Sequence, residues 1–213
     1  MASIEGYAAS TVPVLADLLR RVLGESGLIA LPTESFYGLA VAPFDEQALA
    51  KLWHIKGRSQ GKPILVLIGD RSQLEPFVRS VPRAADVLIN AFWPGPLTIV
   101  FAAAHGLSNA VTAGTGSVGI RLSAWQPLVD LLRRVGPVTG TSANREGLPG
   151  TCANCAVSTA LAASRDRLFI AAWAPIASDT MPTNTAPMVS ERLDTLSCRG
   201  FMRFSQSPYG RVH

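Results

Sequence analysis

The stretch Leu28-Ile29-Ala30-Leu31-Pro32 is an apolar run of strand length, and it leads directly into the polar cluster Thr33-Glu34-Ser35-Phe36-Tyr37-Gly38. An amphipathic helix pattern, Asp17-Leu18-Leu19-Arg20-Arg21-Val22, precedes it. Helix–strand units of this kind deliver the carboxyl ends of strands to one edge of a sheet, where open α/β folds bind ligands. This stretch therefore predicts an α/β fold with polar side chains at one sheet edge.

The same order of elements recurs in the second half of the chain. The helix pattern Asp130-Leu131-Leu132-Arg133-Arg134-Val135 precedes Pro137-Val138-Thr139-Gly140, which runs into Thr141-Ser142-Ala143-Asn144. We infer no internal repeat, because Leu-Leu-Arg-Arg suits any amphipathic helix. Small hydroxyls and amides at strand ends are also ordinary turn residues.

Apolar periodicity predicts the remaining elements. Helices are expected at 11–24, at 46–55 after an Asp45 cap, at 82–92 and at 127–135, and strands at 64–68, 97–102 and 117–122. Strands and helices do not alternate strictly, so a mixed, twisted open sheet with flanking helices is favoured over a Rossmann sheet. The chain contains no G-x-G-x-x-G and no Walker lysine.

Three cations lie within seven residues in Lys56-Gly57-Arg58-Ser59-Gln60-Gly61-Lys62, between a helix pattern and an apolar strand. Two glycines let the backbone turn sharply and bring the cations together. Such a cluster suits a polyanion such as a nucleoside triphosphate. A solvated turn is the alternative interpretation of this string alone.

Composition favours one domain spanning residues 1–213, because no linker divides the chain before about residue 171. The chain has 48% hydrophobic residues and a net charge of +4, with a pI of about 9.3. This modest basic balance suits an anionic ligand or weak RNA contact. We expect a cytoplasmic protein without membrane contact, because the start lacks signal-peptide features and no apolar run approaches ~20 residues.

Nucleophilic catalysis and a metal centre both lack support in the sequence. Three cysteines argue against a disulfide framework, and Cys152-Ala153-Asn154-Cys155 lacks the further ligands of a zinc site. We expect both cysteines to pack inside and no metal to be bound. Glu34 is the lone acid of its cluster, so a paired-carboxylate mechanism has no partner in view.

Five motifs occur in an order that resembles the YrdC-like family, which includes the threonylcarbamoyl-AMP synthases of tRNA modification. They are Pro32-Thr33-Glu34-Ser35-Phe36-Tyr37-Gly38-Leu39, Lys56-Gly57-Arg58 with Lys62-Pro63, Phe92-Trp93-Pro94-Gly95-Pro96-Leu97-Thr98, Val118-Gly119-Ile120-Arg121 and Ser142-Ala143-Asn144. The match is secure over about residues 9–151, whereas residues 152–213 diverge. The resemblance implies a short, single-domain member with the YrdC-like fold and a concave basic cleft.

The family reaction condenses L-threonine, bicarbonate and ATP into threonylcarbamoyl-AMP and pyrophosphate, with Mg²⁺ carried by ATP. The product would pass to tRNA threonylcarbamoyl-transfer proteins, and weak contact with tRNA or double-stranded RNA is compatible with the charge. Transfer at phosphorus requires mainly positioning and charge neutralisation. The absence of a catalytic triad is therefore expected. Two alternatives remain, a non-catalytic RNA-binding module and a paralogue with another substrate.

The resemblance assigns roles to ten residues. Lys56 and Arg58 match catalytic, ATP-binding positions. The other positions implied for ATP are Lys62, Ser117, Ser142, Asn144 and Arg199, and those implied for threonine are Thr33, Arg121 and Thr185. Arg121 would hold the amino-acid carboxylate through two parallel bonds. The alternative for Arg121 is a structural ion pair with Glu34 or Asp130.

Two segments stand apart from these assignments. Residues 169–190 depart from the family pattern, and Pro187 interrupts the expected strand next to Thr185. Whether this segment closes over threonine is therefore open. Trp93-Pro94-Gly95-Pro96 reads as a rigid structural turn with a core or rim aromatic.

Overall fold

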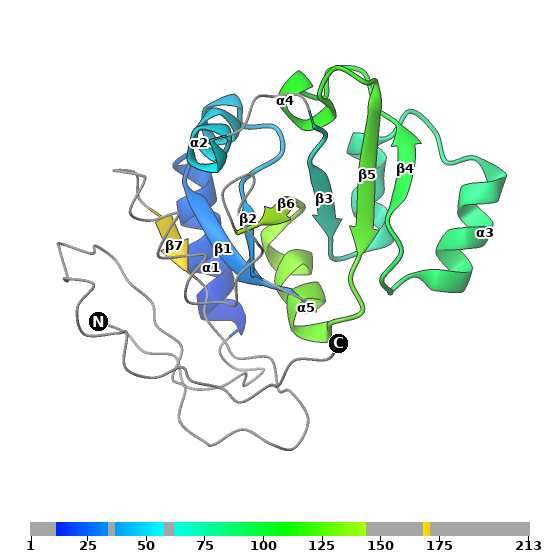
Figure 1. Ribbon diagram of the computed structural model, residues 1–213. Coiled ribbons are helices and arrows are strands. Elements are labelled where there is room, and N and C mark those ends of the chain that lie inside the picture. Colours follow the sequence, from blue (N-terminus) through cyan, green and yellow to red (C-terminus); the bar gives the residue numbers. More distant parts are fainter. Residues whose placement is uncertain (1–11, 34–36, 58–61, 144–167, 171–213) are drawn as a thin grey trace, which may run out of the picture.

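The computed structural model describes residues 12–33, 37–57, 62–143 and 168–170. Seven strands form one mixed sheet in the order β4-β5-β3-β6-β2-β1-β7 (Figure 1). Their bounds are β1 Leu28–Pro32, β2 Tyr37–Ala40, β3 Leu65–Ile68, β4 Ile99–Ala102, β5 Ser117–Leu122, β6 Val138–Ser142 and β7 Leu168–Ile170. Only the β3/β5 and β1/β7 pairs are parallel. The prediction of a mixed open sheet is confirmed.

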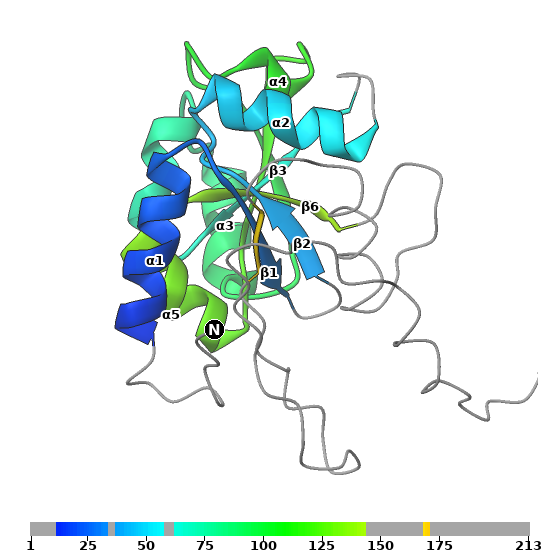
Figure 2. The same cartoon turned by 90° about the vertical axis from the view of Figure 1, so that its left-hand side faces the viewer.

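Helices cover both faces of this sheet. They are α1 Val12–Gly24, α2 Glu46–Lys56, the 3₁₀ helix η1 Arg71–Phe77, α3 Arg83–Phe92, α4 Asn109–Thr112 and α5 Gln126–Val135. Helices α1 and α5 lie side by side on one face, and α2 and α4 pack together over the other (Figure 2). We call the first of these the α1/α5 face.

Two buried clusters reflect this arrangement. Leu19 and Leu128 pack with Leu67 and Val138 on the α1/α5 face. The opposite face buries the alternate strand residues together with α2, α3, α4 and η1. Period-two alternation explains the division, because successive strand side chains point to opposite faces. In β5, Val118, Ile120 and Leu122 are buried in the second cluster.

Helix α2 begins and ends at residues that stabilise helix termini. The Asp45 side chain accepts hydrogen bonds from the backbone amides of Gln47 and Ala48, each at 3.0 Å, as the cap prediction expects. Gly57 ends the helix in the left-handed region, with φ of 61°. This turn places Lys56 at the last position of the helix.

The predicted boundaries agree with the structure to within about two residues for most elements. The sequence did not predict the short strands β2 and β7, the 3₁₀ helix η1 or the short helix α4. Pro76 inside η1 interrupts any helical pattern, and four residues are too few to show a period. In the ranges that the structure describes, no helix combines the length and apolar character needed to cross a membrane.

Candidate functional site

Strand register brings four of the predicted site residues to one edge of the sheet. Strands β1 and β6 both run antiparallel to β2, so their carboxyl ends lie at the same edge. Thr33 directly follows β1, and Ser142 is the last residue of β6. Strand β3 runs antiparallel to β6 and parallel to β5, so β3 and β5 both begin at this edge. Ser117 is the first residue of β5, and Lys62 precedes the first residue of β3 by three positions. We call Thr33, Lys62, Ser117 and Ser142 the polar edge.

Lys56 joins helix α2 to the polar edge. Its Nζ donates a hydrogen bond of 2.6 Å to the backbone carbonyl of Ser142, and the residue is only 4% exposed. The C-terminal end of a helix favours a cation, because its last carbonyls carry partial negative charge. A buried ammonium in this position fixes the end of β6 relative to the end of α2.

Hydroxyl groups gather at the start of β5. The Oγ atoms of Thr115 and Ser117 lie 2.8 Å apart, and Thr115 Oγ1 also donates to the Thr112 carbonyl at 2.7 Å. Gly114 and Gly116 flank Thr115 with φ of 71° and 66°, a conformation that glycine adopts without strain. Because the sequence contains no known glycine-rich phosphate-binding motif, Thr115 was not predicted as a neighbour of Ser117.

The α1/α5 face is only half-buried next to the polar edge. Gly140 of β6 and Gly119 of β5 flank Leu65 of β3 across the sheet, and all three are half-buried. A Cβ atom at Gly119 would lie 3.3 Å from Thr98 Cγ2, and one at Gly140 would lie 3.0 Å from Leu67 Cδ1. Because neither glycine has a side chain, no side-chain atoms project from the sheet at these two positions, which lie beside the hydroxyls and cations of the polar edge.

Arg121 lies on the same face as Gly119 and Ser117, four residues along β5 from Ser117, or about 13 Å at the rise of a strand. Its Nη2 donates to the Pro96 carbonyl at 2.5 Å and its Nε to the Gly95 carbonyl at 3.4 Å. The alternative ion pair with Asp130 is not formed among the described residues, where Asp130 pairs with Arg133 and accepts a hydrogen bond from Gln126. Glu34 lies outside the described residues.

The side chains of the polar edge have the chemistry that suits an anion. Among the described residues, no three His, Cys, Asp or Glu side chains are grouped as metal ligands. Ammonium, guanidinium and hydroxyl groups all donate hydrogen bonds, as an anion requires. Tyr37, which begins β2 at this edge, is largely buried, and this burial raises the pKa of its phenol.

Four predicted site residues, Arg58, Asn144, Thr185 and Arg199, lie outside the described residues, as do Cys152 and Cys155. Their roles therefore stay predictions. The concave basic cleft also stays a prediction, because the flanking loop 58–61 belongs to the same undescribed part.

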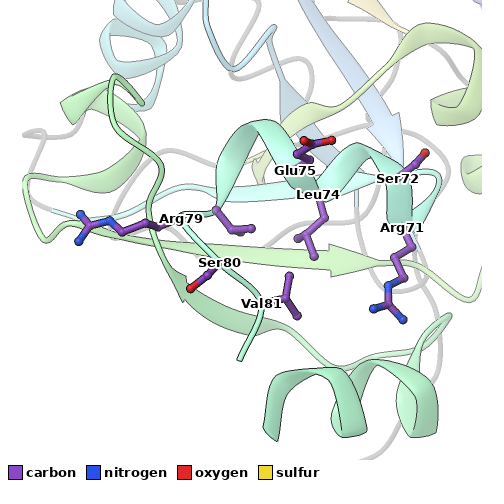
Figure 3. Close-up of a pocket in the computed structure, with 8 residues that line it drawn as sticks. Arg71, Ser72, Leu74, Glu75, Arg79, Ser80 and Val81 are labelled. Atoms are coloured by element: carbon purple, nitrogen blue, oxygen red, sulfur yellow. The ribbon is translucent and has the colours of Figure 1, made fainter. Parts of the chain in front are cut away.

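A hollow of about 570 Å³ lies beside η1, and no predicted site residue lines it (Figure 3). Leu74 and Val78 contribute apolar surface, and Arg71 and Arg79 point away from one another. Arg71 is bound to Asp86 and Asn90. This hollow offers no cluster of convergent polar groups, so we place the candidate site at the polar edge.

The chain is thus an α/β protein with an open mixed sheet and a candidate site whose lysines and hydroxyls suit an anionic ligand. The chain belongs to the Sua5/YciO/YrdC family, whose model, described as "Telomere recombination", matches residues 21–183. The resemblance inferred from the five motifs is thereby confirmed.

Curated relatives include threonylcarbamoyl-AMP synthases. The Pyrococcus abyssi protein is 35% identical over 128 residues, which are 59% of this chain and 37% of that protein. The Thiobacillus denitrificans protein is 36% identical over 130 residues, covering 61% of this chain and 69% of that protein. The match thus spans little more than a third of the Pyrococcus relative.

A solved structure of Pyrococcus abyssi Sua5 complexed with L-threonine has the same fold. It superposes with a TM-score of 0.67 at 29% sequence identity, and the match covers 78% of this chain and 48% of that chain. The shared part of the two proteins therefore includes most of the sheet and its flanking helices.

Proposed function

We propose that this protein is an L-threonylcarbamoyl-AMP synthase, a nucleotidyltransferase that uses L-threonine, bicarbonate and Mg²⁺-bound ATP. The threonine amine and bicarbonate form a carbamate with loss of water. A carbamate oxygen then attacks the α-phosphorus of ATP, so that a new P–O bond forms and pyrophosphate leaves. The mixed anhydride would be consumed by an acyl-transfer reaction to tRNA.

The observation that carries this proposal is the convergence at one sheet edge of Lys56 and Lys62 with Ser117 and Ser142. They come from α2, the segment before β3, β5 and β6. Lys56 and Lys62 are close in the sequence, whereas Ser117 and Ser142 lie far from them and reach the same edge through the pairing of β5 and β6 with β3. The bond from Lys56 to the Ser142 carbonyl joins the two groups. Convergent cations and hydroxyls suit a triphosphate, because hydrogen bonds to charged groups are worth about 1.5–3 kcal/mol each. The names of the curated relatives support the same reaction.

In this proposal Lys56 has two effects. Its ammonium neutralises phosphate charge that develops on the leaving pyrophosphate, and its bond to the Ser142 carbonyl keeps the end of β6 in place. Pre-positioned charge of this kind is the main catalytic contribution that phosphoryl-type transfer needs. Thr33 and Arg121 would contact threonine rather than ATP.

Pyrophosphate release tests the proposal directly. Purified protein should release pyrophosphate from ATP only when L-threonine and bicarbonate are both present, and mass spectrometry should detect threonylcarbamoyl-AMP. Release that is independent of threonine would refute the assignment. Steeply salt-dependent RNA binding without turnover would instead support the non-catalytic alternative.

Two lysines of α2 provide a matched pair of variants. Lys56→Met removes the ammonium at the polar edge, whereas Lys51→Met removes an ammonium that donates to the Ser26 carbonyl at 3.0 Å, away from this edge. We expect Lys56→Met to lose at least about 100-fold in kcat/KM, a loss that corresponds to about 3 kcal/mol. Lys51→Met should keep most of the activity. Equal activity in the two variants would contradict the role of Lys56.

A further inference from the structure

The turn Trp93-Pro94-Gly95-Pro96-Leu97 connects α3 to β4 and is held against the sheet by hydrogen bonds and a ring contact. The indole Nε1 of Trp93 donates to the Leu97 carbonyl at 2.8 Å and so closes the turn. The Gly95 amide donates to the Leu122 carbonyl of β5 at 2.9 Å. The Trp93 ring is 9% exposed and packs edge-on against Phe101, with ring centroids 6.5 Å apart.

This fastening fixes two carbonyl groups against one guanidinium. The Gly95 and Pro96 carbonyls accept from Nε and Nη2 of Arg121, so they occupy the side of the guanidinium next to its stem. An arginine has five N–H donors, of which these bonds use two. At the far end of the guanidinium, Nη1 and Nη2 each present a further N–H. These two donors can bind a carboxylate through two parallel bonds.

Arg121 has no competing anion in the described ranges. The ion pairs there are Arg20–Asp17, Arg71–Asp86 and Arg133–Asp130, and none includes Arg121. Within the described part of the chain its hydrogen-bond acceptors are the two carbonyls of the turn, which are neutral and do not balance its positive charge. A half-buried guanidinium held in this way favours an incoming carboxylate.

We propose that the turn of residues 93–97 is a positioning device for Arg121, which it holds ready for the carboxylate of the amino-acid substrate. This inference rests on the proposed function for the identity of that amino acid. The turn thus has a role in substrate affinity beyond the structural one predicted from its two prolines. Trp93 and Gly95 are positioning residues, since they act through Arg121 and do not themselves touch the substrate.

Preorganisation sets the size of the effect. A long side chain that must be ordered on binding weakens affinity by about three- to tenfold, and a side chain that is already ordered avoids this loss. Loosening the turn should therefore raise the Kd and the KM for L-threonine by about three- to tenfold. The KM for ATP should change less than twofold, because the residues proposed to bind ATP lie at the polar edge.

Two tryptophans supply a matched comparison. Trp93→Phe removes the indole bond to Leu97, and Trp53→Phe removes the bond from the buried Trp53 indole to the Ala110 carbonyl at 3.1 Å. Both variants lose one indole–carbonyl bond in the protein interior, so their melting temperatures should fall by similar amounts. Only Trp93→Phe should weaken threonine binding.

Gly95→Ala provides a second, stronger perturbation. A Cβ atom there would lie 2.1 Å from the Phe92 carbonyl oxygen, so the backbone of the turn must move. Threonine binding should weaken by at least about tenfold. Should this variant fail to fold, Trp93→Phe against Trp53→Phe still decides the question.

Calorimetric titration of each protein with L-threonine and with L-threoninamide is the decisive measurement. Wild type should bind threonine more tightly than the amide, which lacks the carboxylate charge, and Trp93→Phe should lose most of this preference. An unchanged preference in Trp93→Phe would overturn the inference. Wild type that binds threonine without releasing pyrophosphate would refute the proposed reaction but leave this comparison valid, whereas wild type that binds no threonine would overturn both.

Discussion

Replacing Gly119 by alanine adds one methyl group to the half-buried α1/α5 face of β5. The new Cβ would lie 3.3 Å from Thr98 Cγ2 and 3.9 Å from Leu65 Cδ1. Thr98 is exposed, so its side chain can rotate to another staggered position and relieve the contact. Alanine also restricts the unfolded chain, which stabilises the fold by about 0.4–1 kcal/mol where the backbone accepts it. We therefore expect the free energy of unfolding to change by less than about 1 kcal/mol.

The same methyl group would lie between Ser117 and Arg121 on one face of β5, and these are residues that we propose contact ATP and threonine. Crowding a well-packed contact costs about 1–3 kcal/mol, which corresponds to about five- to 150-fold in binding. Gly119→Ala should therefore lose at least about fivefold in kcat/KM while its melting curve stays close to that of wild type. Thermal melts and pyrophosphate release measured on the same preparations test this separation.

Alanine variants of two further glycines serve as controls for the effect of Gly119→Ala on stability and activity. At Gly140 the added Cβ would lie 3.0 Å from Leu67 Cδ1, and Leu67 is buried at 6% exposure. Gly140→Ala should therefore lose stability as well as activity. Gly24, at the end of α1, has no neighbour within 4 Å of an added Cβ, so Gly24→Ala should preserve both. Full activity in Gly119→Ala would refute the proposal that ligands lie on this face.

Two other outcomes are expected. Partial burial of Asp45 opposes its ionisation. Hydrogen bonds from the first turn of α2 and from the Ser26 side chain, together with the charge of Lys51, outweigh this and hold the pKa of the Asp45 carboxyl below its usual range. The stabilising contribution of the ionised cap is therefore present above the unfolded pKa of about 3.9 and is lost as pH falls through the folded pKa. Asp45→Ala should cost about 1 kcal/mol at pH 7, and denaturation at pH 7 and pH 3 should show the difference from wild type shrinking; a constant difference would contradict the charged cap. Metal analysis should find no stoichiometric zinc in wild type, and the double variant Cys152→Ser, Cys155→Ser should keep its activity; zinc that is lost in that variant would contradict their assignment as packing residues.

The helices and strands were largely predictable because their patterns are local. Period-two alternation in Ser117–Leu122 is enough to predict a strand, and the Asp45 cap is enough to predict the start of a helix. The sheet order was not predictable in the same way. The antiparallel placement of β2 between β1 and β6 depends on pairing between distant segments, and single-strand patterns carry no information about partners.

Backbone groups account for the part of the candidate site that the sequence could not reveal. Lys56 and Arg121 were both recognisable as cations that suit anions, but their observed partners are the carbonyls of Ser142, Gly95 and Pro96. Every residue has a carbonyl, so no residue type marks the ones that orient a cation. The observed bonds therefore change the expected mutational pattern. Replacing a side chain that only holds one of these carbonyls in place should alter substrate affinity, although that side chain does not contact the substrate. Truncating Ser142, by contrast, removes its hydroxyl but leaves its backbone carbonyl free to accept the bond from Lys56.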